Sequence, residues 1–204
     1  MIHDRSIYSQ RLPRLVIKLY SLWVKRKFKR LDSLLDPRVE IRNPQYISIG
    51  AGVHLRPYTW IYAIPGVSEK SDKFHPSIEI GDGSSIGRFC HITATNHVLL
   101  EPEILVAEGV FISDNFHGYQ DIETPIIRQP MVSLGPVIIG RGTWIGNGAI
   151  ITGKLRVGKN CVIGANAFVN KDVPDYCVVA GIPAVILKRY DPAAKQWISV
   201  HEPL

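Results

Sequence analysis

The chain has 204 residues, 46% of them hydrophobic, which suffices for one buried core and excludes a disordered chain. Its net charge of +6 is uneven, because residues 1–30 hold nine Lys or Arg against one Asp while the remainder is slightly acidic. No apolar run approaches the ~20 residues that span a bilayer. The most apolar stretch, residues 15–24, lacks a signal-peptide cleavage site. The three cysteines have no C-x-x-C spacing, which indicates a reducing compartment. A cytoplasmic protein is expected.

Residues 1–35 are predicted to form a basic amphipathic helical arm. The apolar side chains at helical spacing are Leu12, Leu15, Val16, Leu19 and Trp23. The basic side chains among and after them are Arg14, Lys18, Lys25, Arg26, Lys27, Lys29 and Arg30. We expect residues 11–30 either to contact an anionic membrane at its cytoplasmic face or to pack on the end of an assembly. No nucleic-acid-binding motif accompanies the charge, so no nucleic-acid partner is expected.

A period of six residues runs through most of the remaining chain. Residues 139–174 divide into IGRGTW, IGNGAI, ITGKLR, VGKNCV, IGANAF and VNKDVP, and the same frame recurs at 49–54 and 80–97. The first position is always aliphatic and the fourth is mostly Gly, Asn or Asp, as short strands joined by corners of positive φ require. The pattern predicts a parallel β-helix over residues 36–175, with insertions at about 63–77 and 113–137 and a C-terminal extension at 176–204.

The stretch GAIITGKL at residues 148–155 is close to a phosphate-binding loop, but the repeat explains it better. Gly148 occupies a corner position, and Leu155 stands where a magnesium-binding hydroxyl is required. No helix pattern follows to present its N-terminus to a phosphate. A nucleotide-binding loop is therefore rejected.

The same frame places two cysteines and two of the seven histidines. Cys90 and Cys161 fall on inward fifth positions and are expected in the core. His91 and His97 fall on sixth positions of consecutive blocks, so they should lie on different faces of one coil. They are expected to be surface or interface side chains rather than metal ligands, and no metal site is predicted.

Three motifs add a resemblance to a known family: VFISDNFHGY at residues 110–119, WIGNGAIITG at 144–153 and NKDVPDYCVVAGIPAVILKR at 170–189. Over residues 78–190 the chain resembles the hexapeptide-repeat acyltransferases, most closely their sugar and polysaccharide O-acetyltransferase branch. The resemblance implies a left-handed β-helix, a homotrimer, acetyl-CoA between subunits, and a protruding loop with a catalytic histidine. The expected fold is thus all-β, a left-handed parallel β-helix with an N-terminal amphipathic helix and a short C-terminal helix.

By this resemblance the catalytic residue is His117, just after the break in the repeat. Imidazole is suited to take a proton from an acceptor hydroxyl near neutral pH. The family motif D-H-N-H-G reads D-N-F-H-G here, with Asn115 and Phe116 in place of its first histidine and its asparagine. Asp114, Asn115 and Tyr119 are expected to contact the acceptor, while for Asp114 a capping role in its own loop is an equal alternative.

Acetyl-CoA is the expected co-substrate, and the resemblance places seven residues along its groove: Trp144, Asn147, Ala165, Asn170, Lys171, Lys188 and Arg189. A small side chain lets the pantetheine arm approach the backbone, and the cations can pair with phosphate. Trp144 has subunit packing as an alternative role, and each lysine has that of a solvated surface residue. The family often has Arg where this chain has Val185, which leaves Lys188 and Arg189 for the 3′-phosphate.

Together these features predict an acetyl-CoA-dependent O-acetyltransferase for a saccharide, such as a cell-surface polysaccharide precursor, with His117 as general base. A covalent acyl-cysteine is disfavoured, because two of the three cysteines face the core. Three alternatives stay open. They are N-acylation of an amino sugar, a γ-carbonic-anhydrase-like metalloenzyme with histidines converging across a subunit boundary, and a non-catalytic β-helix that serves assembly.

Overall fold

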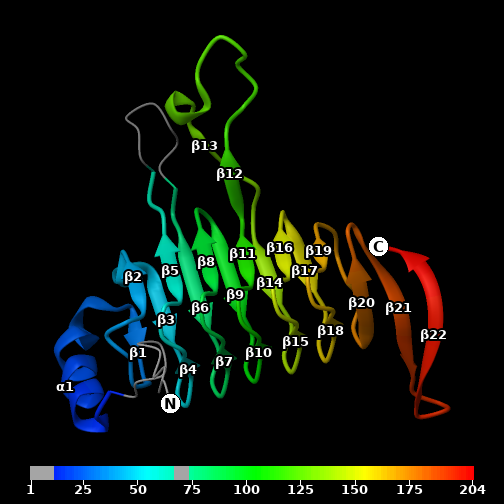
Figure 1. Cartoon of the computed structure of the whole chain (residues 1–204), viewed down its shortest axis with the longest axis horizontal. Helices are drawn as coiled ribbons and strands as arrows, with labels where there is room; N and C mark the ends of the chain where they lie inside the picture. The colour runs from blue at the N-terminus through cyan, green and yellow to red at the C-terminus, as the bar shows by residue number, and fades with distance from the viewer. Residues whose placement is uncertain (1–11, 67–73) are drawn as a thin grey trace, which may run out of the picture.

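The computed structural model describes residues 12–66 and 74–204 and shows a left-handed parallel β-helix (Figure 1). Three sheets, here named A, B and C, form the faces of a triangular prism, and a two-stranded hairpin projects from its side. Their strands are parallel except for the last two strands of sheet C. From coil to coil the chain passes through the sheets in the order A, C, B. The expected fold class is therefore confirmed for the prism itself.

Each sheet collects one strand from successive coils. Sheet A contains β1 (Arg30–Leu31), β3 (Ile47–Ile49), β6 (Ser77–Ile80), β9 (His97–Leu100), β14 (Val137–Ile139) and β17 (Leu155–Val157). Sheet B contains β2 (Glu40–Arg42), β5 (Trp60–Ala63), β8 (His91–Ala94), β11 (Phe111–Ser113), β16 (Ile150–Thr152) and β19 (Phe168–Val169). Sheet C contains β4 (His54–Leu55), β7 (Ser85–Ile86), β10 (Leu105–Val106), β15 (Trp144–Ile145), β18 (Val162–Ile163), β20 (Cys177–Gly181), β21 (Ala184–Asp191) and β22 (Gln196–Pro203).

The core consists of aliphatic ladders that run along the inside of each sheet. In sheet B the parallel register stacks one residue from each of five successive coils, all fully buried: Ile61, Ile92, Ile112, Ile151 and Val169. Each coil thereby covers the apolar row of its neighbour. A short strand with one inward aliphatic residue is stable only in such a stack, which is why the period of six specifies this fold.

The corners between sheets require positive φ, as the fourth position of the repeat predicts. Gly148, Asn160 and Asn166 adopt φ values of 66°, 49° and 56°. The same position holds Tyr58 and Phe89, at 66° and 57°, and their rings stack 5.7 Å apart on adjacent coils. Positive φ is unfavourable for bulky residues, and the ring contact offsets part of that cost.

Both insertions leave the prism at one edge, where the chain turns from sheet B to sheet A. The first joins β5 to β6, and its residues 67–73 lie outside the described part of the chain. The second joins β11 to β14 and contains β12 (Asn115–His117), a 3₁₀ turn (Ile126–Arg128) and β13 (Met131–Ser133). Figure 1 shows this second insertion, residues 114–136, standing well away from the prism. In the coil between them the same turn is short and consists of Thr95 and Asn96.

Residues 176–204 are all described and contain no helix, so the expected short C-terminal helix is wrong. β21 and β22 instead pair antiparallel with β20 and extend sheet C. The physical reason is the period of the apolar residues: Ala184 and Ile186 are buried while Val185 between them is half-buried. That alternation fits a strand and not a helix.

The N-terminal arm forms α1 (Arg14–Val24) and a 3₁₀ turn (Lys25–Lys27), which lie at the first coils of the prism, and another 3₁₀ turn spans Pro44–Tyr46. Residues 1–11, which belong to the expected arm, lie outside the described part. Within the described ranges, every helix is too short or too polar to cross a membrane. Ser21 and Val24 are the buried residues of α1, so most of the apolar stripe expected from the sequence faces away from the prism.

Candidate active site

His117 ends β12 in the projecting loop, where main-chain pairing with Met131 of β13 fixes its backbone. The next residue, Gly118, donates a backbone hydrogen bond to the Pro130 carbonyl at 3.0 Å, and an added Cβ would lie 2.7 Å from that oxygen. Glycine is therefore needed to keep the hairpin closed beside the histidine. The His117 side chain is exposed, so its ring is accessible to an acceptor.

Asp114 attaches this loop to the prism. Its carboxylate is fully buried; Oδ1 accepts hydrogen bonds from Thr95 N (2.7 Å), Thr95 Oγ1 (3.0 Å) and Asn115 Nδ2 (3.0 Å), and Oδ2 accepts one from Asn96 N (2.7 Å). Thr95 and Asn96 form the short turn of the neighbouring coil at the same edge. These contacts support the capping alternative for Asp114, and its contact with an acceptor stays a prediction.

Asn115 and Tyr119, also expected to contact the acceptor, differ in exposure. Asn115 is 9% exposed, and its amide donates to Thr93 Oγ1 at 3.4 Å as well as to Asp114. Tyr119 is 64% exposed, and its ring centre lies 5.7 Å from that of Phe116. Of the three residues, Tyr119 alone offers an exposed side chain.

Trp144 lies on the outer face of sheet C, as its sixth position in the repeat predicts. It aligns with Leu105 of the preceding coil and Val162 of the following one, and the side chains of Trp144 and Leu105 are about half exposed. The chain then turns at the edge between sheets C and B, where Asn147 and Ala165 occupy equivalent exposed positions in successive coils.

The remaining coenzyme candidates lie elsewhere on the prism, and two of them already have partners. Asn170 and Lys171 follow β19 at the edge between sheets B and A, and Lys171 Nζ donates to the Leu204 carbonyl at 3.2 Å. Lys188 and Arg189 lie on β21, where Arg189 pairs with Glu202 at 2.7 Å. The exposed Lys188 forms no ion pair with another described residue.

Within one chain the candidate residues thus fall into two groups on separate edges. The edge between sheets B and A holds the His117 loop together with Asn170 and Lys171. The outer face of sheet C and its edge with sheet B hold the second group: Trp144, Asn147, Ala165, Lys188 and Arg189. Because the whole width of sheet B separates these edges, a single chain does not bring the two groups together.

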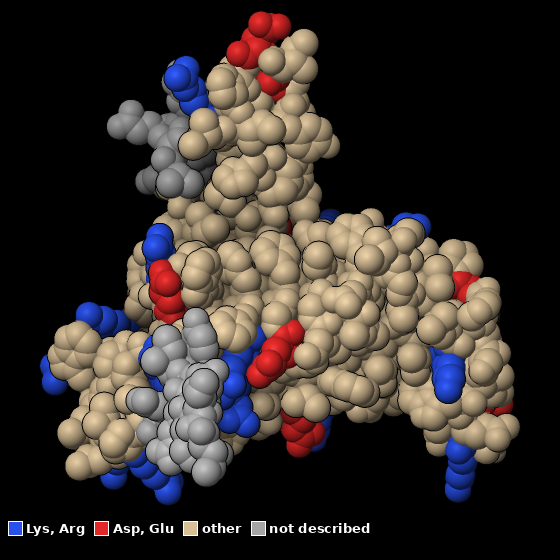
Figure 2. Space-filling model, viewed as in Figure 1, with Lys and Arg blue, Asp and Glu red and all other residues tan. Residues whose placement is uncertain are grey.

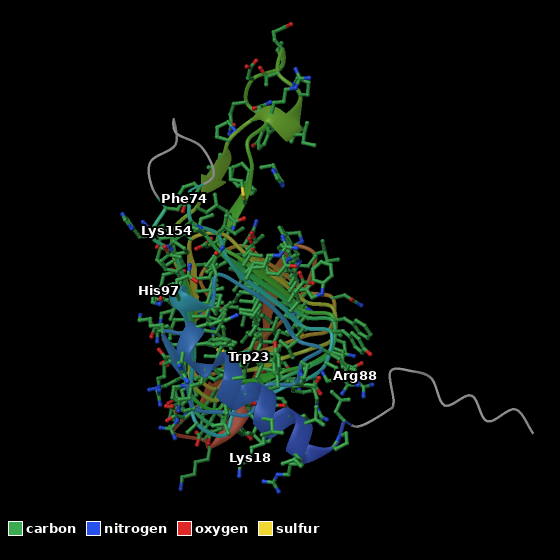
Figure 3. All side chains as sticks on the ribbon, turned by 90° about the vertical axis from the view of Figure 1, so that its left-hand side faces the viewer. Lys18, Trp23, Phe74, Arg88, His97 and Lys154 are labelled. Carbon is green, nitrogen blue, oxygen red and sulfur yellow. The ribbon has the colours of Figure 1, made fainter. Side chains whose placement is uncertain are left out.

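Lys154, which belongs to the rejected phosphate-loop stretch at residues 148–155, adds a cation at the base of the His117 loop (Figure 3). Its side-chain Cγ and Cδ lie 3.2 Å from where a Cβ on Gly135 would stand, and Gly135 has a φ of 108°. Glycine at this point lets the lysine side chain pack under the returning strand. The available sequence signal was Gly135 next to Pro136, which marks the turn but not the lysine it covers.

An aromatic row lies on the outer face of sheet B, where Trp60, His91 and Phe111 begin their strands. The His91 ring is contacted edge-on by Trp60, Tyr62 and Phe111, with centroids 5.5, 5.7 and 5.3 Å away. No motif marks this row in the sequence; its signal is that Trp60, His91 and Phe111 share the sixth position of the repeat. His91 Nε2 is buried without a hydrogen-bond partner, and burial lowers the pKa of His91.

This environment predicts a loss of stability as the pH falls. The unfolded chain protonates His91 near its ordinary pKa of about 6.5, whereas the folded ring resists protonation because its pKa is lowered. The free energy of unfolding is therefore highest above the pKa of the unfolded chain and decreases as the pH falls from about 7 to 5. Urea unfolding at several pH values should show a smaller decrease for His91→Phe, which keeps an aromatic ring in the row.

The matched control is His201→Phe, because His201 is exposed in β22. This variant should keep the pH dependence of the wild type. An unchanged pH dependence in His91→Phe would contradict the assignment to His91.

The cysteines are buried, as expected for Cys90 and Cys161, and Cys177 is buried as well. Burial raises the pKa of Cys90 and of Cys161 to about 11, so neither is a thiolate near neutral pH. In the described ranges no three His, Cys, Asp or Glu side chains are grouped to hold a metal ion. His91 and His97 lie on sheets B and A, as the repeat predicts.

Sequence comparison gives both a family and relatives. The model of the bacterial transferase hexapeptide (six repeats) matches residues 136–171. WbbJ of Escherichia coli strain K12, named as a candidate lipopolysaccharide biosynthesis O-acetyl transferase, is 32% identical over 139 residues, which cover 65% of this chain and 71% of WbbJ. Rv3034c of Mycobacterium tuberculosis, named as a candidate acetyltransferase, is 27% identical over 180 residues, covering 84% of this chain and 59% of Rv3034c.

Solved structures share the fold. The N-acyltransferase AntD from Bacillus cereus, in complex with dTDP and 3-hydroxybutyryl-CoA, gives a TM-score of 0.69 at 17% identity over 86% of this chain and 90% of its own. A maltose O-acetyltransferase from Clostridium difficile 630 gives 0.59 at 19% identity over 91% and 81% of the two chains. At such identities the likeness concerns the β-helix and not the substrate.

Proposed function

Since the chain belongs to the hexapeptide-repeat acyltransferase family, we propose that it is an acetyl-CoA-dependent O-acetyltransferase acting on a hydroxyl of a saccharide. The observation that carries the proposal is the placement of His117, an exposed imidazole at the end of a strand in a loop anchored by buried Asp114. The names of WbbJ and Rv3034c support acetyl transfer, and that of WbbJ supports a polysaccharide acceptor.

In this proposal His117 is the general base. An acceptor hydroxyl is a weak nucleophile, so a ring nitrogen of His117 accepts its proton while the oxygen attacks the acyl carbonyl, and the proton then passes to the departing thiolate. Exposed Tyr119 offers an aromatic ring and a hydroxyl to the sugar beside the histidine. Direct transfer also agrees with the buried, protonated state of Cys90 and Cys161.

Acetyl-CoA would supply the acetyl group as an activated thioester. The outer face of sheet C fits such a molecule, because Trp144 and Leu105 expose apolar surface and Lys188, which has no ion pair with a described residue, can pair with a phosphate. Ala165 at the adjoining edge leaves room for a pantetheine arm beside the backbone. To pair with a phosphate of acetyl-CoA, Arg189 would have to give up its ion pair with Glu202.

We further propose a homotrimer, in which the two groups of candidate residues meet across subunits. His117 lies at the edge between sheets B and A, whereas Trp144 and Ala165 lie on sheet C and at the edge between sheets C and B. Two neighbouring subunits that present these different edges to each other would complete one site from two half-sites. A cytoplasmic location near the membrane, where precursors of cell-surface polysaccharides would be met, belongs to the same proposal.

The experiment that tests the activity is release of free CoA from acetyl-CoA by the wild-type protein over a panel of nucleotide sugars, oligosaccharides and amino sugars. The proposal expects saccharide-dependent thiol release and an ester-linked acetyl group in the product. An alkali-stable amide on an amino sugar would instead indicate N-acylation. Absence of thiol release with every acceptor would favour the assembly role.

A further inference from the structure

α1 has two apolar faces, and only one of them is used by the prism. Ser21 and Val24 are buried and Tyr20 is partly buried against the core. On the opposite side of the helix, Leu15 and Leu19 are 66% and 59% exposed. Leu22 and Trp23 on the same exposed side raise the apolar area further, at 59% and 67% exposure. So large an exposed apolar stripe on one short helix marks an interaction surface.

Basic side chains surround this stripe, which we name the α1 outer face (Leu15, Leu19, Leu22 and Trp23). Residues 14–31 contain seven Lys or Arg and no Asp or Glu. Three of the cations are balanced by prism carboxylates: Lys25 and Arg30 contact Asp32, and Lys29 contacts Glu79. The other four, Arg14, Lys18, Arg26 and Lys27, form no ion pair within the described part of the chain. Figure 2 shows Lys and Arg side chains gathered around α1 at this end of the molecule.

A groove beside the α1 outer face also combines apolar side chains with a cation. It has a volume of about 230 Å³ and lies between α1 and the first coils of the prism. Its lining is almost entirely apolar or aromatic: Tyr20, Trp23, Val24, Lys27, Phe28, Leu35, Ile41 and Pro44. The Lys27 ammonium lies 4.7 Å from the centre of the Trp23 ring. This arrangement suits a ligand that carries an anionic group next to a hydrocarbon chain.

From these features we infer that the α1 outer face binds the surface of an anionic lipid membrane. The apolar stripe enters the boundary between headgroups and acyl chains, where Trp is favoured, and the unpaired cations meet lipid phosphates. A second copy of the chain is the less suitable partner. A two-fold contact between two α1 helices would oppose like charges, with no acidic side chain in either segment to offset them. Figure 3 looks onto this end, with Lys18 and Trp23 marked on the helix.

The test is flotation of the full chain with vesicles of phosphatidylcholine alone and of phosphatidylcholine with about one third phosphatidylglycerol. The wild type should bind the anionic vesicles at least about tenfold more strongly, and binding should fall at about 1 M salt, where the Debye length shrinks to ~3 Å. Leu15→Ser with Leu19→Ser should weaken binding by about tenfold or more. Lys18→Gln with Arg26→Gln should do the same at low salt.

Matched controls come from the far end of the prism. Ile198→Ser removes an exposed apolar side chain of β22, and Lys195→Gln removes an exposed basic side chain of the turn before β22; both variants should bind as the wild type does. The inference is overturned if the wild type does not prefer anionic vesicles or if the two leucine changes leave binding unaltered. If those changes instead alter the assembly measured by light scattering, the face joins copies of the chain. CoA release in solution needs no vesicles, so failure here leaves the proposed acyl transfer untouched.

Discussion

Replacing His117 with alanine should lower kcat/KM for acetyl transfer by about 10²–10⁴-fold, because in the proposed mechanism the acceptor hydroxyl would lose its general base. The measurement is thiol release from acetyl-CoA with whichever saccharide gives the highest rate with the wild type. Stability should change by less than about 0.5 kcal/mol, since the side chain is exposed and its backbone pairing with Met131 does not depend on the ring.

The matched control is His201→Ala, which removes another exposed imidazole, in this case from β22. It should retain the wild-type rate, so that loss of any surface histidine is excluded as the cause. If His117→Ala keeps more than about a tenth of the wild-type kcat/KM, far above the range for a general base, His117 does not have that role.

Replacing Asp114 with alanine should lower the free energy of unfolding by about 2–5 kcal/mol. The buried carboxylate accepts hydrogen bonds from the backbone amides of Thr95 and Asn96, both at 2.7 Å. Each buried donor left without an acceptor costs about 1–3 kcal/mol. Urea unfolding followed by circular dichroism measures the change, and acetyl transfer should fall too because the His117 loop loses its attachment to the prism.

Asp121→Ala in the same loop is the control for this prediction. Asp121 is exposed and accepts a local hydrogen bond from Glu123 N at 2.9 Å, so its loss should cost less than about 1 kcal/mol. Equal destabilisation by the two replacements would show that Asp114 does not anchor the loop. Asp114→Asn, which keeps the shape but replaces one acceptor oxygen by a donor, should fall between alanine and the wild type.

The prism could be predicted from the sequence because its stabilising contacts repeat. Every coil offers an aliphatic residue at one position and a residue tolerant of positive φ three places on, so the same signal occurs many times. The insertion that carries His117 could be predicted for the complementary reason, as the place where the frame stops. Tyr58 and Phe89 at corner positions are stabilised by stacking on each other, and a single block of six does not reveal such a partner.

For Asp114 the sequence left acceptor contact and loop capping as equal alternatives, and it could not decide between them because the partners of Asp114 come from a different coil. The two amides that bind it belong to Thr95 and Asn96, which are brought beside it only when the coils stack. For α1, spacing identified an apolar stripe but not which face would meet the prism: Val24 packs, while Leu15 and Leu19 remain exposed. In the C-terminal extension, pairing with β20 overrode the expectation of a helix.

The arrangement of the site was likewise hidden in the linear motifs. The motifs with His117, Trp144 and Lys188 follow one another along the chain, yet His117 lies at the edge between sheets B and A while Trp144 and Lys188 lie on sheet C. Only the winding of the coils shows that one chain keeps the His117 loop and the proposed coenzyme surface apart. A complete site from two subunits is therefore the central claim of our account.

Complementation between two inactive variants tests this claim most directly. His117→Ala and Ala165→Trp would be co-produced with different tags, and assemblies that carry both tags would be assayed for CoA release with the active saccharide. If sites form between subunits, some of them combine an intact His117 from one chain with an intact Ala165 surface from another, so activity returns. Mixed assemblies as inactive as either parent would contradict the account.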